Sequence, residues 1–115
     1  MFPYENLAVY KKAFEVNRKV YAILREKKTL PDYIKKQLGR ATLSIILNIA
    51  EGSWRFANKD RRNFFITARG STFECAATIH FLFAENELTQ IEMTALKGNL
   101  EEISKILFTM IKNLG

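Results

Sequence analysis

Apolar residues recur at helical spacing in four long segments of this chain, and short polar breaks separate the segments. The four segments cover residues 5–28, about 32–55, about 59–87, and 90 to the end of the chain. Only two prolines and five glycines occur, and no stretch alternates apolar and polar residues as a strand does. Helices of this length joined by short turns pack as antiparallel neighbours. The pattern therefore predicts an all-α fold with one domain over residues 1–115, an up-down-up-down antiparallel four-helix bundle.

The three breaks carry signals for where helices begin. Pro31, in the turn TLPD, can stand at the start of the second helix without removing a hydrogen bond. We expect the side chain of Asn58 to cap the third helix. Thr89 and Glu92 form a T-x-x-E capping box, which predicts the start of the fourth helix.

Composition limits the class of protein. The chain has 115 residues, of which 48% are hydrophobic and 26% charged, as in ordinary folded domains. No apolar run approaches the roughly 18 residues of a membrane span, and the first residues lack the pattern of a signal peptide. The single Cys75 has no partner for an intrachain disulfide, which fits a reducing compartment. We expect a cytoplasmic protein that does not enter a membrane.

Charge is distributed unevenly along the chain. The net charge is +6, and residues 1–69 hold fifteen of the eighteen Lys and Arg but only six of the twelve Asp and Glu. Such asymmetry favours a basic surface for an acidic partner, of which nucleic acid is the commonest. The alternative is a helical surface on which lysines serve only solubility.

The second helical segment combines a polar line with an unusually wide apolar surface. On a helical projection five polar residues share a strip roughly 80° wide: Arg40, Ser44, Asn48, Glu51 and Arg55. Apolar side chains cover most of the remainder, about twice the stripe of about 100° that a small bundle requires. Either this helix is the most buried element of a monomer, or its second apolar face packs against another copy. We favour self-association, because every helix of a four-helix bundle has an outer side.

The third segment supplies possible partners for the polar line. Small residues cluster around Arg69 and Glu74, and they permit close approach of another helix. Paired structural groups are the preferred interpretation, with Glu51–Arg69 and Arg40–Glu74 as plausible pairs. We expect Glu51 to have an arginine partner, either Arg69 or Arg55. The predicted structural seam comprises Ser44, Asn48, Glu51, Arg69 and Glu74.

Catalytic and metal-binding patterns are missing from the sequence. No phosphate-binding loop, dinucleotide fingerprint, HExxH or CxxC motif is present, and His80 is the only histidine. We interpret His80 as a partly buried structural residue and Cys75 as a small packing residue. The expectation is a protein that is not an enzyme, with no catalytic residues, no metal and no cofactor.

The basic residues are the strongest candidates for a binding role. The segment WRFANKDRR, from Trp54 to Arg62, is the densest mixture of cations and aromatic rings. Arg and Lys there can contact phosphates, and Trp54 or Phe56 can stack on an exposed base. Alternatively, these two rings are interface or core anchors. The predicted nucleic-acid-binding set comprises Lys11, Lys12, Arg18, Lys19, Arg40, Arg55, Lys59, Arg61 and Arg62.

Three blocks of the sequence resemble a known family. The blocks NLAVYKKAFE, QLGRATLSIILNIAEGSWR and FFITARGSTFE are similar to the bacterial four-helix-bundle proteins encoded by intervening sequences in 23S rRNA genes. The same superfamily includes the accessory variability determinant (Avd) protein of diversity-generating retroelements. The resemblance implies a homopentameric ring and nucleic-acid binding through basic surfaces, and the retroelement member also binds a reverse transcriptase. Gly39 and Arg40 stand where the family commonly has two arginines, which removes one cation.

Two functions follow from these observations. The leading hypothesis is a non-enzymatic homo-oligomer, a pentamer by resemblance, that binds RNA or DNA through its basic N-terminal half without sequence specificity. The alternative is an interaction scaffold for a protein partner such as a reverse transcriptase, with no direct contact to nucleic acid.

Overall fold

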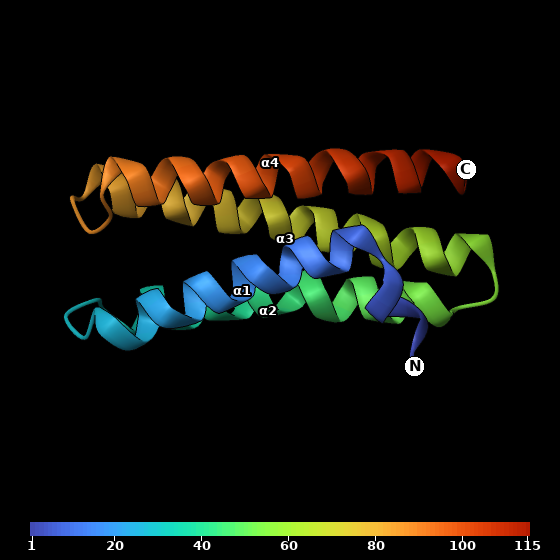
Figure 1. The fold of residues 1–115 in the computed structure, drawn as a ribbon, viewed down its shortest axis with the longest axis horizontal. Coiled ribbons are helices and arrows are strands. Elements are labelled where there is room, and N and C mark those ends of the chain that lie inside the picture. The colour runs from blue at the N-terminus through green and yellow to red at the C-terminus, as the bar shows by residue number, and fades with distance from the viewer.

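The computed structural model describes residues 1–115 and contains four long α-helices and no strand. A short 3-10 helix, η1 (Pro3–Asn6), precedes α1 (Ala8–Glu26), α2 (Asp32–Trp54), α3 (Asn58–Ala84) and α4 (Gln90–Asn113). Consecutive helices run in opposite directions, as predicted, and both termini lie at the end of the bundle where α2 connects to α3 (Figure 1). The molecule is a rod of 44 × 22 × 22 Å.

The backbone of each helix lies close to two neighbouring helices. Helix α1 packs against α2 and α4, and α3 packs against the same two helices, whereas no Cα atoms of α1 and α3, or of α2 and α4, lie within 8 Å of each other. Twenty-one buried apolar residues from all four helices and the loops form one core cluster. In α1 the core residues Val9, Ala13, Val16, Val20 and Ile23 follow the apolar period of the sequence. The α1–α4 interface and the α2–α3 interface therefore lie on opposite sides of the bundle.

The helix boundaries confirm some of the predicted signals and correct others. Thr89 Oγ1 accepts a hydrogen bond from the Glu92 amide, and the Glu92 carboxylate accepts one from the Thr89 amide, so the capping box is confirmed. The expected cap at Asn58 is wrong. The capping position of α3 is Ala57, whose extended backbone (φ −76°, ψ 134°) starts the helix one residue earlier, so Asn58 is already in the first turn.

The start of α1 and the end of α3 also differ from the sequence prediction. Residues before Ala8 form η1 instead of extending α1, because Leu7 adopts an extended backbone between the two helices. Helix α3 ends at Ala84 and not near residue 87. Asn86 takes the left-handed conformation (φ 62°), and the Glu87 amide donates to the Leu82 carbonyl at 2.8 Å, as in a Schellman cap.

One close approach explains the glycine in the block NIAEG. A Cβ atom built on Gly52 would lie 2.6 Å from Cε1 of Phe65, a ring of α3 that is completely buried. Only a residue without a side chain lets α2 and this ring meet at that distance. No helix of the chain combines the length and the apolar character of a membrane span.

Candidate functional site

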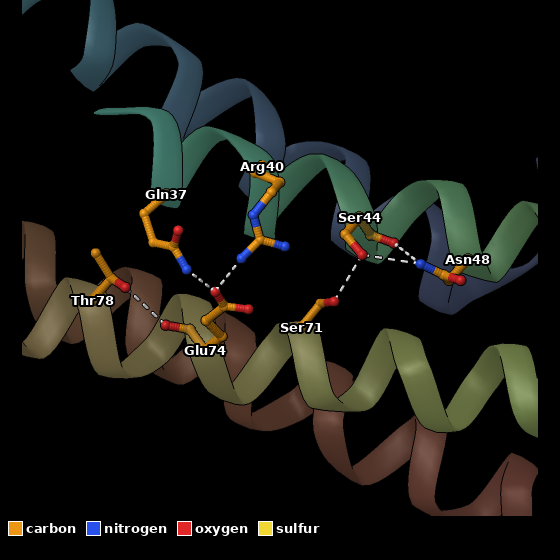
Figure 2. Close-up of polar contacts among 7 residues, drawn as sticks. All are labelled: Gln37, Arg40, Ser44, Asn48, Ser71, Glu74 and Thr78. Atoms are coloured by element: carbon orange, nitrogen blue, oxygen red, sulfur yellow. Dashed lines mark hydrogen bonds and ion pairs between the residues drawn. The ribbon is translucent and has the colours of Figure 1, made fainter. Parts of the chain in front are cut away.

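Two neighbouring sets of polar contacts join α2 to α3 (Figure 2). Ser44 Oγ and Ser71 Oγ are 2.8 Å apart across the two helices. Asn48 Nδ2 donates to the Ser44 carbonyl at 2.9 Å and to Ser44 Oγ at 3.0 Å. We call these contacts, together with that of Arg40 with Glu74, the α2–α3 seam; Ser44 and Arg40 reach α3, and Asn48 supports Ser44 within α2. Because Ser71 is buried, a shift of one helix along the other would leave its hydroxyl without a partner, whereas Ser44 would keep only its contact with Asn48.

Toward the N-terminus of α2, the seam contains an ion pair. Arg40 Nη2 lies 2.5 Å from Glu74 Oε1, which confirms the predicted pair. Gln37 Nε2 donates to the same carboxylate oxygen, and Thr78 Oγ1 donates to the Glu74 carbonyl at 2.9 Å (Figure 2). Sequence reasoning missed Gln37, Thr78 and the pairing of Ser71. Their spacing was the available signal, since residues 71, 74 and 78 are three and four apart and so lie on one side of α3.

The C-terminal end of α2 holds a second ion pair, this one within a single helix. Arg55 Nη2 lies 3.1 Å from Glu51 Oε2, so the expectation of an arginine partner for Glu51 is confirmed with Arg55. The same oxygen accepts a hydrogen bond from Trp54 Nε1 at 3.2 Å. The Arg55 guanidinium carbon is 4.4 Å from the centre of the Trp54 ring and 4.6 Å from that of Phe64. The cation is thus held between two rings and a carboxylate.

Arg69 does not belong to the seam. Its Nε donates to the Ser104 carbonyl of α4 at 3.2 Å, and its guanidinium carbon lies 5.0 Å from the ring centre of Phe73 and 5.2 Å from that of Phe108. The predicted Glu51–Arg69 pair is therefore absent. The physical reason is helix rotation, because residue 69 lies five positions before Glu74, about 140° around α3.

The outer surface of α3 and α4 is apolar and hollowed around Arg69. A groove of about 380 Å³ is lined there by Ile66, Gly70, Phe73, Phe108 and Ile111, together with Arg62 and Arg69. We call this feature the α3–α4 groove. A Cβ atom on Gly70 would have no neighbour within 4 Å, so this glycine, unlike Gly52, is not required by packing within the chain.

Helix α2 also keeps apolar side chains in solvent. Leu43, Leu47 and Trp54 are about half exposed, although the core side of the same helix is fully buried. The wide apolar surface expected from the sequence is thus not covered within one chain.

The nine predicted nucleic-acid-binding residues fall into three places and do not form one surface. Lys11, Lys12 and Lys19 line a groove of about 320 Å³ between α1 and α4 that contains no hydrophobic side chain. Arg18 is nearby on α1 and lies 3.5 Å from Glu15. Arg40 and Arg55 are on the α2–α3 side and are paired with carboxylates. Lys59, Arg61 and Arg62 occupy the first turns of α3.

The cations also differ in how far they are engaged within the chain. Lys12 pairs with Glu102 of α4, and Arg61 Nε donates to the Gly52 carbonyl at 3.2 Å. By contrast, the exposed side chains of Lys11, Lys19, Lys59 and Arg62 make no ion pair or side-chain hydrogen bond. These four are free to meet an external anion.

Cys75 and His80, the residues considered for catalysis, differ in burial. Cys75 is fully buried and 3.8 Å from Thr42 Oγ1. The pKa of its thiol is raised to about 11, chiefly by burial; the Thr42 hydroxyl opposes the rise and the neighbouring Glu74 charge adds to it. At neutral pH the thiol is therefore protonated and not nucleophilic. His80 is exposed on α3 instead of partly buried as expected, and no three His, Cys, Asp or Glu side chains gather where they could hold a metal.

Comparison with known proteins places the chain in a family. No curated protein matches the sequence. The fold is similar to a crystal structure of a protein of unknown function from the S23 ribosomal protein family of Bacteroides thetaiotaomicron VPI-5482, with a TM-score of 0.87 and 21% identity over 91% of this chain and 99% of that one. The sequence model of the 23S rRNA-intervening sequence protein family matches residues 5–109. The chain, with its four-helix bundle, belongs to the 23S rRNA-intervening sequence protein family.

Proposed function

We propose that this protein is a non-enzymatic homo-oligomer that binds RNA or DNA through phosphates, without reading the base sequence. The observation that carries the proposal is the set of exposed, unengaged cations Lys11, Lys19, Lys59 and Arg62. A cation already paired with a carboxylate contributes less free energy to a contact with phosphate, because the existing pair must be broken or shared. The net charge of +6 adds a long-range attraction for polyanions.

The α1–α4 groove is the better candidate for contacts with the phosphate backbone. Lys11 and Lys19 are separated by eight residues, about 12 Å along the helix axis, so they can follow an extended chain of phosphates. The lining of the groove is wholly polar, with Asn99 as an uncharged donor beside the lysines. Glu15 and Glu102 also line it and reduce its positive potential. Binding is therefore expected to be moderate and strongly dependent on salt.

Salt-titrated binding tests this proposal. Fluorescently labelled RNA and DNA should bind at low ionic strength, and the affinity should fall steeply as salt rises. The double variant Lys11→Glu/Lys19→Glu should weaken binding and reduce the slope of log K against log salt by about two. A matched control, Lys36→Glu/Lys97→Glu, changes two exposed lysines outside the groove by the same charge and should retain most of the slope. Equal loss in both variants would overturn the assignment of the groove, and no binding at low salt would overturn the function.

Assembly is the second part of the proposal. The half-exposed Leu43 and Leu47 of α2 and the exposed rings of Phe73 and Phe108 in the α3–α4 groove are two unlike apolar surfaces on one chain. When one surface of a protomer packs against the other surface of the next, the contact is heterologous and closes into a ring if the rotation permits. The homopentameric ring that the family resemblance implies would be one such closed assembly.

Sedimentation equilibrium tests the assembly. The wild-type protein should sediment as one species of five times the protomer mass. Phe73→Ser, in the α3–α4 groove, should shift it to smaller species, whereas Ile91→Ser should not, since Ile91 is 83% exposed at the start of α4 and outside the groove. A wild-type monomer at high concentration would contradict this part of the proposal.

A further inference from the structure

The connection between α2 and α3 exposes two aromatic rings at one end of the bundle. Helix α2 ends at Trp54 and α3 begins at Asn58, so only three residues make the turn. Phe56 within it is 98% exposed, and Trp54 is 53% exposed. A phenylalanine that is almost wholly in water contributes nothing to the core of this chain. The exposed ring in the turn and the half-exposed ring at the end of α2 together form a concentrated apolar feature of the kind that marks binding sites.

Trp54 is held in place before any ligand arrives. Its indole N–H donates to Glu51 Oε2 at 3.2 Å, and the Arg55 guanidinium lies over the ring at 4.4 Å from its centre. Arg55 is in turn fixed by Glu51 and by the ring of Phe64. The indole therefore has a fixed orientation while half of its surface remains free. Stacking on a ring that is already ordered costs little conformational entropy.

Two unengaged cations lie directly beside these rings along the chain. Lys59 and Arg62 are exposed, are three residues apart in the first turns of α3 and therefore project from neighbouring positions of the helix. Neither makes an ion pair, and Asp60 between them is the one acidic residue of this segment. Aromatic rings next to free cations are the elements with which proteins bind single-stranded nucleic acid, whose bases are free to stack.

We propose that the α2–α3 turn binds single-stranded nucleic acid, with bases stacked on Trp54 and Phe56 and phosphates on Lys59 and Arg62. This inference rests on the proposed nucleic-acid-binding function and adds a preference for strands over duplexes. A duplex keeps its bases stacked inside and offers only phosphates, so it gains nothing from the two rings.

The single tryptophan of the chain is a built-in reporter for this site. Titration with a 12-nucleotide uridine oligomer should quench Trp54 emission to saturation, whereas a 12-base-pair RNA duplex should quench it little. Phe56→Ala should weaken binding of the single strand about 10-fold and leave duplex binding unchanged. Tyr33→Ala is the matched control, because Tyr33 is an exposed aromatic at the first turn of α2, at the other end of the bundle. Circular dichroism verifies that both variants are folded.

Three results would overturn the inference, and they are distinguishable from failure of the proposed function. Anisotropy of a labelled oligomer measures binding independently of the tryptophan. If strand and duplex bind equally and Trp54 emission does not change, nucleic-acid binding stands and the stacking site does not. If Phe56→Ala and Tyr33→Ala lower strand affinity equally, the turn is not the site. If Trp54 emission is blue-shifted in the free protein and shifts to the red on dilution, another copy of the chain covers the ring. If neither nucleic acid binds, both proposals fail together.

Discussion

The two sides of α3 meet their surroundings in different ways. Toward α2, Ser71 and Glu74 find hydroxyl, amide and guanidinium partners within the same chain. Toward α4 and the surface, Phe73 and Phe108 flank Arg69, and both rings remain more than half exposed. The α2–α3 seam is thus complete in one protomer and fixes how two helices align. The rings of the α3–α4 groove are not covered within the protomer. The assembly proposal requires a neighbouring molecule to cover them.

The largest expected effect on stability comes from comparing two glycines: Gly52, where α2 packs against α3, and Gly70, which lines the α3–α4 groove. Gly52→Ala would place Cβ 2.6 Å from the Phe65 ring, and such overpacking should lower the free energy of unfolding by about 2 kcal/mol. Gly70→Ala meets no atom within 4 Å and should raise the free energy of unfolding by about 0.5–1 kcal/mol, because alanine favours the helix. Urea unfolding of the two variants measures both changes. A destabilising Gly70→Ala in the isolated protomer would remove the distinction between the two sides.

The glycines also show where sequence reasoning stops. Periodicity predicted four antiparallel helices and placed Ser44, Asn48 and Glu51 on one strip of α2, because local spacing fixes which residues of a helix share a side. It did not reveal that Gly52 accommodates Phe65, since that contact joins residues thirteen positions apart through the tertiary packing of two helices. The capping position of α3 was misplaced at Asn58 because the backbone of Ala57, not the side chain of Asn58, determines where the helix starts.

The choice of partner across α3 shows the same limit. Arg69 and Arg55 were both acceptable partners for Glu51 by charge, and only the rotation of α3 excludes Arg69. The sequence could have predicted part of that rotation, because residues 71, 74 and 78 lie together on one side of the helix and residue 69 does not. The engagement of each cation was not encoded at all. Lys12 and Lys11 are adjacent in sequence, yet only Lys12 pairs with Glu102.

Cys75 provides the next largest effect, on the core side of α3. Its pKa is raised from 9.0 to about 11, chiefly by burial, so the folded state disfavours the thiolate. The corresponding stability is fully present below pH 9 and should be lost as pH rises from about 9 toward 11, by roughly 2 kcal/mol. Unfolding measured at pH 8 to 10.5 should show a steeper decline for the wild type than for Cys75→Ala, in which other alkaline titrations remain. Parallel pH profiles would contradict burial of the thiol.

The hydroxyl pair of the seam has a smaller predicted effect. Ser44→Ala and Ser71→Ala should each lower the free energy of unfolding by about 1 kcal/mol, because each leaves the opposite hydroxyl with fewer partners. The double variant should cost less than the sum of the two, and the difference measures the coupling across α2 and α3. Thr109→Ala is the control, because it removes an exposed hydroxyl that bonds only to its own helix. Additive losses in the cycle would show that the two serines do not act as a pair.

The smallest effect is expected at the solvent end of the seam, where Arg40 meets Glu74. The Arg40 side chain is 60% exposed, and exposed ion pairs contribute about 0.5 kcal/mol or less. Arg40→Met should therefore change stability little, the more so because Gln37 still donates to the Glu74 carboxylate. A cycle of Arg40→Met and Glu74→Gln should give a coupling energy that falls toward zero in about 1 M salt, since screening weakens exposed charges. The Ser44–Ser71 coupling should not change with salt, because neither group carries a charge. If the two couplings respond alike to salt, the seam is held by electrostatics along its whole length and the role assigned to its hydroxyls is wrong.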